Sequence, residues 1–387
     1  MGKPKIRFKG YEDDWEQRKL GEVAQEFKSG NSLKADEIDI TGDYPVYGGN
    51  GLRGYTSTYN HDGEYALIGR QGALCGNMNY SVGKAYFTEH AVVVKADENN
   101  DTRFLYYMLD TMNLGQYSDQ SAQPGLAVNK LVKLENQFPM KEEQQRIGWY
   151  FSNIDHLITL HQRKCEETKS LKKYMLQKMF PENGNCVPKI RFSGFADAWE
   201  QRKLKDYLEV SREKNKTESY GKEDVLSVSG EHGIVNQIEF QGRSFAGVSV
   251  ANYGVVEAGD VVYTKSPLKS NPYGIIKTNK GKTGIVSTLY AVYKPRMNTN
   301  SEFVQIYFEL DSRMNSYMHP LVNKGAKNDM KVSDENALKG PVAFPELEEQ
   351  NAITQYFDKL DHLITLHQHK CDELQKLKKF MLQNMFV

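Results

Sequence analysis

Residues 138–180 read FPMKEEQQRIGWYFSNIDHLITLHQRKCEETKSLKKYMLQKMF, and residues 344–386 read FPELEEQNAITQYFDKLDHLITLHQHKCDELQKLKKFMLQNMF. The block DHLITLHQ is identical in both, and the two copies align without a gap at an offset of 206 residues. Each copy opens with Phe-Pro, and proline cannot continue a helix from the residues before it. Two glutamates then fall in the first turn, where carboxylates suit the positive end of the helix dipole. Each copy therefore predicts one long helix, which at about 40 residues is on the order of 60 Å long.

Apolar residues recur along both copies at steps of four and three, which is the pattern of a coiled coil. One apolar seam needs a partner, and the other copy of the repeat is the obvious one. We expect Cys165 and Cys371 to be small apolar fillers of this seam. The residues expected at the helix interface are Phe151, Ile154, Ile158, His161, Phe357, Leu360, Ile364 and His367.

A second repeat precedes each helix. Residues 4–20 read PKIRFKGYEDDWEQRKL and residues 188–204 read PKIRFSGFADAWEQRKL, at an offset of 184. The inserts between the repeats, 21–137 and 205–343, show little resemblance to each other. Drift after duplication would not spare the frame and erase only the inserts. The duplicated frame therefore indicates two different specificities carried on one scaffold.

The segment PENGNCV at 181–187 ends the first helix and turns the chain. A long helix, a short turn and a return predict two units related by a pseudo-twofold axis, with antiparallel helices and a globular domain at each end. The expected domains are a first recognition domain at 1–140, a first helix with its linker at 141–184, a second recognition domain at 185–346 and a second helix at 347–387.

The first insert predicts a mixed α/β domain with long polar loops. Residues 65–70 and 91–95 are short apolar runs expected to be strands, and residues 102–110 have a helical pattern. Residues 118–129 (SDQSAQPGLAVN) are expected to form a polar loop. Long loops in a compact domain usually carry function.

The second insert has the same style with other residues. Strands are expected at 225–228, 255–256, 261–263 and 284–293. Between residues 261 and 301 there is no acidic residue, and four tyrosines are interleaved with basic residues. The basic residues are Lys265, Lys269, Lys277, Lys280, Lys282, Lys294 and Arg296. This run predicts a positive face for phosphate contacts, although a solvated lysine face is the alternative.

Base reading requires amide, hydroxyl and cationic side chains at loop tips. The candidate DNA-binding residues are Asn50, Arg53, Tyr55, Arg70, Gln71, Asn77, Asn79, Gln120, Ser121, Gln123, Arg243, Lys265, Ser266, Lys269, Asn271, Tyr273, Lys324, Lys327 and Asn328. Glycines in these loops more often serve turn geometry or close backbone approach than side-chain recognition.

Composition and motifs exclude several classes. The chain has 387 residues and a formal net charge of zero, with no apolar run of membrane-spanning length and no signal peptide. Its four cysteines do not form a disulfide framework, so we expect a reducing, cytoplasmic setting. The GKT at 281–283 lacks the upstream glycine of a P-loop, and the NPY at 271–273 lacks the second proline of an adenine-methyltransferase box. Zinc between His161 and His367 is an alternative to a polar layer in the seam, but nothing supplies the remaining ligands. We expect no catalytic residue, metal or cofactor in this chain.

The WEQRKL segments at 15–20 and 199–204, the DHLITLHQ blocks, and the glycine segments YGGNG (47–51) and GRQGA (69–73) together resemble the specificity subunit of a type I restriction–modification enzyme. The resemblance covers essentially the whole chain. It implies two target-recognition domains, each reading one half of a bipartite DNA site, and helices that set the spacing and dock two methyltransferase subunits. Restriction/translocase subunits would join for cleavage, and S-adenosylmethionine would bind the partner methyltransferase.

Two other classes stay open at this point. A self-contained DNA enzyme is disfavoured because no acid cluster or cofactor loop is present. A coiled-coil scaffold without DNA specificity would show no salt-dependent shift with random duplex DNA.

Overall fold

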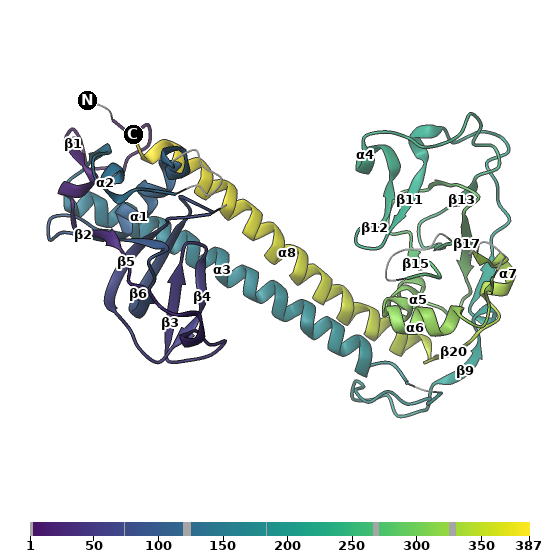
Figure 1. The fold of residues 1–387 in the computed structure, drawn as a ribbon. Coiled ribbons are helices and arrows are strands. Elements are labelled where there is room, and N and C mark those ends of the chain that lie inside the picture. Colours follow the sequence, from purple (N-terminus) through teal and green to yellow (C-terminus); the bar gives the residue numbers. More distant parts are fainter. Residues whose placement is uncertain (1–2, 73, 119–124, 183, 266–270, 325–329) are drawn as a thin grey trace. The chain divides into compact units, whose positions relative to one another are not determined.

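The chain folds into two compact units in this computed structural model, which describes residues 3–72, 74–118, 125–182, 184–265, 271–324 and 330–387 (Figure 1). Unit 1 comprises Met1–Arg163 and His367–Val387, and unit 2 comprises Lys164–Leu366. Each unit contains one insert and part of both long helices.

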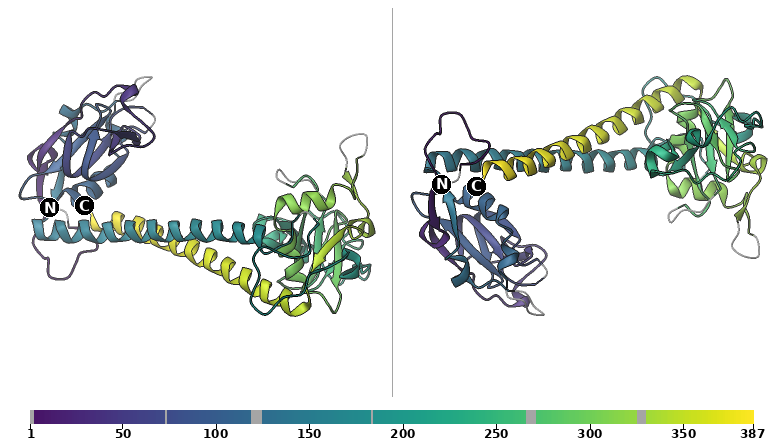
Figure 2. Two further views of the ribbon diagram at one scale, coloured as in Figure 1. Left: turned by 90° about the horizontal axis from the view of Figure 1, so that it is seen from below. Right: turned by 90° about the horizontal axis from the view of Figure 1, so that it is seen from above.

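The two repeated stretches form α3 (Lys141–Lys178) and α8 (Leu347–Met385), which are continuous in each of the three views (Figures 1 and 2). Both long helices predicted by the repeat are confirmed, and each begins two residues or fewer after its Phe-Pro. The acidic first turns are present in both, as helix-dipole complementarity requires.

Within unit 1, the segments of α3 and α8 run antiparallel. Lys378 Nζ lies 2.6 Å from Asp155 Oδ1, and His161 Nδ1 lies 3.0 Å from His367 Nδ1. The residue number rises along α3 as it falls along α8, so the pairing is antiparallel, as predicted. The two histidines form a polar layer in the seam, in direct contact with each other.

Within unit 2, the helices pair in the same sense. Cys165 Sγ lies 3.9 Å from the carbonyl oxygen of Ile364, and Lys172 Nζ lies 2.6 Å from Asp361 Oδ1. Lys172 and Asp361 stand 206 residues from Lys378 and Asp155, so each unit repeats the ion pair of the other with the partners exchanged between helices. Cys165 is buried, as is its counterpart Cys371, in agreement with their expected role as fillers.

In both units, the strand at the end of the PKIRF-to-WEQRKL repeat pairs with a strand just before the long helix. In unit 1, β1 (Glu16–Lys19) pairs antiparallel with β8 (Glu135–Phe138) just before α3. In unit 2, β9 (Glu200–Lys203) pairs with β20 (Pro341–Phe344) just before α8. In both units the insert therefore begins after one strand of this pair and ends before the other.

A buried ion pair locks each frame. Arg7 Nε and Nη2 each donate to a carboxylate oxygen of Glu143 at 2.7 Å, and Arg191 binds Glu349 with the same two distances. Glu349 also accepts from Trp199 Nε1 at 3.2 Å. The equivalent Trp15 Nε1 is buried without a hydrogen-bond partner among the described residues.

Backbone hydrogen bonds join each PKIRF segment to the end of a long helix. In unit 1, the amide of Ile6 donates to the carbonyl of Asn384 at 2.9 Å. In unit 2, the amide of Ile190 donates to the carbonyl of Lys178, also at 2.9 Å. The same bond therefore forms between residues joined by the linker in one unit and between residues near opposite ends of the sequence in the other.

The first insert is built on a six-stranded sheet with the order β2-β7-β5-β6-β3-β4. All neighbouring strands are antiparallel except β3 and β6, which pair in parallel. The strands are β2 (Ala24–Ser29), β3 (Tyr44–Gly48), β4 (Gly51–Thr56), β5 (His61–Gly69), β6 (Met78–Phe87) and β7 (Ala91–Ala96). The helices are α1 (Thr102–Thr111), α2 (Val128–Leu131) and the 3-10 turns Leu20–Glu22, Ala35–Glu37 and Leu114–Tyr117.

Helix α1 links this sheet to α3. Its Tyr107 ring lies 5.1 Å from the Phe151 ring of α3, and buried side chains of β5, β7, α1 and α3 form one core. The predicted strands at 65–70 and 91–95 and the predicted helix at 102–110 are confirmed by β5, β7 and α1. The expected loop at 118–129 ends in the short helix α2, and residues 119–124 lie outside the described part of the chain.

The second insert is built on a four-stranded sheet with the order β10-β17-β14-β15, accompanied by two-stranded sheets. Its strands are β10 (Leu208–Val210), β11 (Leu226–Ser229), β12 (Gly233–Asn236), β13 (Gly254–Val256), β14 (Val261–Thr264), β15 (Ile275–Thr278), β16 (Gly284–Val286), β17 (Tyr290–Pro295), β18 (Asn323–Lys324) and β19 (Met330–Lys331). Its helices are α4 (Gln237–Gln241), α5 (Ser301–Phe308), α6 (Asp311–Met318), α7 (Asp334–Ala337) and the 3-10 turns Leu204–Asp206 and Lys222–Asp224.

The predicted run at 284–293 is divided between two strands. β16 pairs with β13, whereas β17 pairs with β10 and β14. Apolar β-branched residues on both sides of the break conceal it in the sequence. The mixed α/β class holds for both inserts.

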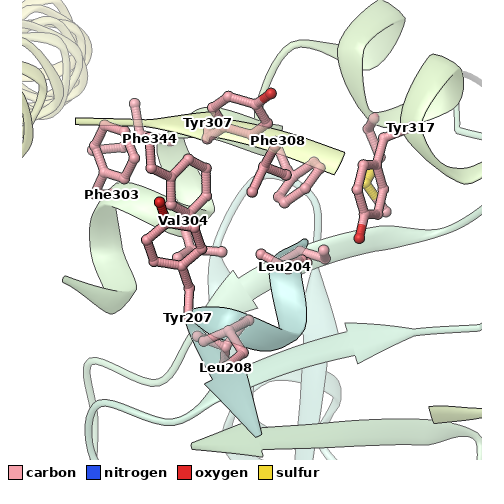
Figure 3. Close-up of a cluster of buried hydrophobic side chains, with 14 of the residues drawn as sticks. Leu204, Tyr207, Leu208, Phe303, Val304, Tyr307, Phe308, Tyr317 and Phe344 are labelled. Atoms are coloured by element: carbon pink, nitrogen blue, oxygen red, sulfur yellow. The ribbon is translucent and has the colours of Figure 1, made fainter. Parts of the chain in front are cut away.

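Aromatic rings dominate the core of unit 2 (Figure 3). The rings of Tyr207 and Phe303 lie 4.6 Å and 5.0 Å from the ring of Phe344, and Tyr307 is also 5.0 Å from Phe344. This core includes Phe357 and Leu360 of α8, just as Phe151, Ile154 and Ile158 of α3 belong to the core of unit 1. These five of the expected interface residues thus pack in the cores of the two units. Among the described residues, no helix is long and apolar enough to cross a bilayer.

Candidate functional site

Two glycine segments that are separate in the sequence meet in unit 1. A Cβ added to Gly69 would lie 2.3 Å from the carbonyl oxygen of Gly49, closer than any side chain can approach. A Cβ on Gly49 would lie 3.3 Å from the carbonyl oxygen of Gln71 and 3.1 Å from that of His90. The β3–β4 turn, the loop after β5 and the turn before β7 therefore touch backbone to backbone. At Gly69 only glycine permits this approach, which is the use of glycine that the sequence suggested.

Polar candidate residues gather around this junction. Asn50 lies exposed in the β3–β4 turn and Arg53 lies exposed on β4. Asn79 Oδ1 would lie 2.8 Å from a Cβ on Gly51, so this amide lies against the same turn. Gln71 is exposed in the loop after β5. The structure thus brings candidates from three segments to this junction.

The other described candidates of unit 1 lie around this group. Tyr55 is half-buried on β4, where its amide and carbonyl bond to the backbone of Asp39. Asn77 is exposed and its carbonyl accepts from the amide of Gly69 at 2.8 Å. Gln120, Ser121 and Gln123 lie outside the described residues.

Arg70 is held at the junction by its backbone. Its amide donates to the carbonyl of His90 and its carbonyl accepts from the amide of Leu126, both at 2.9 Å. The half-buried side chain reaches the carbonyl of Glu89 at 3.4 Å through Nη1. This is a weak hydrogen bond by distance, so most of the guanidinium's donor capacity is available to a ligand.

His90 is a member of the cluster that sequence reasoning missed. Its Nδ1 lies 3.0 Å from Gln71 Oε1, and its Nε2 lies 3.5 Å from Glu89 Oε1. His90 and Gln71 are 19 residues apart and are brought together by the pairing of β5 with β7. No short motif in the sequence signals this contact.

The described candidates of unit 2 do not converge in the same way. Arg243 is exposed, with its guanidinium 4.5 Å from the centre of the Phe245 ring. Asn271 is buried and donates to Asp311 at 2.8 Å, so its amide is engaged inside the fold. Tyr273 is half-buried, and its carbonyl accepts from the hydroxyl of Tyr263.

Ser266, Lys269, Lys327 and Asn328 lie outside the described residues, and Lys324 is described only as part of the β18 backbone.

The predicted positive face of the second insert is wrong for most of its described residues. Lys265 pairs with Asp334 at 2.6 Å, and Lys294 pairs with Glu257 at 2.5 Å. Lys277 is buried, and desolvation by burial lowers its pKa.

Two more of these basic residues are paired as well. Lys280 lies 2.6 Å from Glu302 and 3.0 Å from Asp358, and Arg296 lies 3.4 Å from Glu209. The acids come from outside the acid-free run, so local composition could not reveal the neutralisation. Lys282 is exposed, and Lys269 lies outside the described residues.

No group of three or more histidine, cysteine or carboxylate side chains suited to hold a metal is found within the residues that the structure describes. The side chains gathered at the junction in unit 1 offer hydrogen bonds through amides, an imidazole and guanidinium groups. These are the groups that proteins use to contact base edges and phosphates.

Comparison with known proteins gives concordant matches. Residues 12–170 match the family model described as type I restriction modification DNA specificity domain. The EcoprrI specificity subunit of a type I restriction enzyme from Escherichia coli is 42% identical over 156 residues, which is 39% of each chain. A putative type I specificity subunit from Haemophilus influenzae is 28% identical over 36% of this chain and 37% of its own length. The chain thus spans about two-fifths of the length of these two relatives.

More distant relatives match over nearly the full length. The putative MjaX specificity subunit from Methanocaldococcus jannaschii is 22% identical over 95% of this chain and 91% of its own. The crystal structure of the S subunit of a type I restriction–modification system from M. genitalium superposes with a TM-score of 0.67 at 15% identity, covering 100% of this chain and 99% of that one. This likeness concerns the fold.

Proposed function

We propose that the chain is a type I restriction–modification specificity subunit and that it selects the DNA sequence on which a type I complex acts. Each insert would read one half of a bipartite, asymmetric site on double-stranded DNA. The observation that carries this proposal is the repeated frame around two unlike inserts, because one mode of mounting then presents two different recognition surfaces.

The junction in unit 1 supports recognition of the first half-site. Hydrogen-bond donors and acceptors are offered here by Asn50 and Gln71 in the connecting loops, by Arg70 after β5, by Arg53 on β4 and by Asn79 on β6. Fixed amides and a guanidinium suit base edges, where each good bidentate contact discriminates by about 1–3 kcal/mol.

We further propose that the long helices dock two methyltransferase subunits. Apolar side chains of α3 and α8 remain exposed at positions 206 residues apart. Leu157 and Leu363 are 40% and 41% exposed, and Leu171 and Leu377 are 45% and 42% exposed. Surfaces that repeat in residue and in exposure support binding two copies of one partner.

The rest of the complex follows from this assignment. The chain itself would contribute no catalytic residue, while S-adenosylmethionine would bind the methyltransferase subunits. Restriction/translocase subunits would join the complex for cleavage, and the complex would act in the cytoplasm.

The direct test is selection from a random duplex pool. The chain, purified with the methyltransferase that it binds, would be incubated with randomised duplex DNA at low and at high salt, and the retained duplexes would be sequenced. We expect enrichment of two short half-sites separated by a gap of constant length. Retention that is independent of sequence, or absent, would leave a coiled-coil scaffold as the better description.

The helices would set the length of the gap. Four residues inserted after Gln162, about one helical turn, should lengthen the gap and leave the half-site bases unchanged. Two inserted residues would rotate the apolar seam away from its partner and serve as the disruptive control. A folded four-residue variant that selects the original gap would show that the helices are not the ruler.

A further inference from the structure

The side chain of Gln71 is exposed at the end of the first insert's sheet, yet its carboxamide is not left to rotate. Gln71 Oε1 lies 3.0 Å from His90 Nδ1. Within the part of the chain that the structure describes, Gln71 Nε2 has no hydrogen-bond partner. One end of the amide is therefore fixed, and the other end is presented outward.

The backbones of these two residues are tied together as well. The amide of Arg70 donates to the carbonyl of His90 at 2.9 Å, and the carbonyl of Arg70 accepts from Leu126. Gly49 packs against the carbonyl oxygens of both Gln71 and His90. Only the side-chain torsions of Gln71 remain to be restrained, and the imidazole restrains them.

The polarity of the contact decides what Gln71 can offer. Because Oε1 is an acceptor, Nδ1 of His90 donates. Glu89 Oε1 lies 3.5 Å from Nε2, on the other side of the ring. Gln71 then presents two N–H donors of Nε2 and the second lone pair of Oε1.

This pattern of one donor and one acceptor side by side matches the edge of adenine in the major groove, where N7 accepts and N6 donates. We propose that Gln71 reads an adenine of the first half-site and that His90 is the positioning residue that aims its carboxamide. The proposal rests on the proposed function, because it names a base and a residue pair within that recognition.

The alternative role for His90 is structural, as a tie between the loop after β5 and the turn before β7. Two amide substitutions of His90 distinguish the two roles. Asparagine at position 90 places an N–H donor where histidine carries Nδ1, whereas glutamine places its amide nearer the position of Nε2. His90→Asn should therefore preserve the aim of Gln71, and His90→Gln should not.

The test compares base preferences selected from a randomised duplex pool by the full chain with its methyltransferase. The variants are Gln71→Ala, His90→Ala, His90→Asn, His90→Gln and the Gln71→Ala/His90→Ala double variant. In wild type we expect one position of the first half-site to require adenine. Gln71→Ala and His90→Ala should relax that position alone, by between about five-fold and about a hundred-fold. The double variant should relax it no further than Gln71→Ala does.

A base analogue gives an independent readout. Replacing that adenine by 7-deazaadenine removes the N7 acceptor, which should weaken binding by wild type and by His90→Asn but not by Gln71→Ala.

Three results would overturn the proposal. His90→Ala could retain the wild-type preference, it could weaken every position alike as a structural residue would, or His90→Gln could match wild type where His90→Asn does not. These results differ from failure of the proposed function, in which wild type itself selects no bipartite sequence.

Discussion

Removing Arg7 should destabilise unit 1 more than removing Arg191 destabilises unit 2. The guanidinium of Arg7 makes two hydrogen bonds of 2.7 Å to Glu143, whose side chain is 1% exposed. Arg7→Ala would leave this carboxylate buried without its partner, and breaking a buried pair in this way typically costs about 3–5 kcal/mol.

Arg191→Ala breaks the same two bonds, but Glu349 keeps the donor Nε1 of Trp199 at 3.2 Å. A hydrogen bond to a charged group is worth about 1.5–3 kcal/mol. We therefore expect the free energy of opening in unit 2 to fall by about 1.5–3 kcal/mol less than the free energy of opening in unit 1.

Two units in one chain make a single unfolding midpoint ambiguous. Hydrogen exchange followed by mass spectrometry resolves them, because peptides from β1 and β8 report on unit 1 and peptides from β9 and β20 on unit 2. Arg18→Ala is the matched control, since Arg18 pairs with Glu16 at the surface, where such pairs are worth about 0–1 kcal/mol. Equal losses for Arg7→Ala and Arg191→Ala, or a loss for Arg7→Ala no larger than that of the control, would refute the reasoning.

Gly274→Ala should cost more than about 3 kcal/mol in unit 2, because its Cβ would lie 1.8 Å from the carbonyl oxygen of Thr264; Gly259→Ala, with a similar positive φ but open space, should cost about 1–2 kcal/mol. Comparable exchange protection in the two variants would contradict this. Burial lowers the pKa of Lys277 below its unfolded value, so the unfolded state binds more protons and unit 2 gains stability as pH rises through the interval between the two pKa values. Lys277→Met should raise the stability of unit 2 at neutral pH, on the order of 1 kcal/mol, and abolish the alkaline gain in a denaturant series. Leu157→Glu and Leu363→Glu should each remove one methyltransferase from the complex without unfolding the chain, which mass photometry would detect; two bound subunits in either variant would place the docking surface elsewhere.

The long helices were predictable because the sequence signals for each helix lie close together, and because the same signals occur in two copies. Phe-Pro, an acidic first turn and a repeating apolar seam all lie within one stretch, and α3 and α8 begin where these signals stand. The role of the PKIRF segment was not predictable from its own residues. Arg7 meets Glu143 across 136 residues, and only the pairing of β1 with β8 brings them together.

The predictions of the candidate site also succeeded where the signal was local and failed where it depended on distant residues. Glycine-flanked polar loops in the first insert do converge, because the glycines that mark them also allow their backbones to touch. The basic run in the second insert failed as a predictor because Asp334, Glu257 and Glu302 neutralise it from other segments. Charge along a sequence predicts a charged surface only where the fold brings no counter-charge to it. His90 was invisible for the same reason, since its role depends on strand pairing.

The backbone bond from Ile6 to Asn384 has a topological consequence. Its counterpart from Ile190 to Lys178 spans the short linker, so one bond closes a loop between residues 178 and 190 and the other closes the polypeptide into a ring. A circularly permuted chain, opened within the linker and joined between residues 384 and 6 by a linker of similar length, would make the same contacts in both units. Closing a short loop of this kind costs little conformational entropy when the chain folds. The order of the two inserts in the sequence is then set by the point at which the ring is opened. A replacement of one insert by another has to preserve only the repeated segments on either side of it.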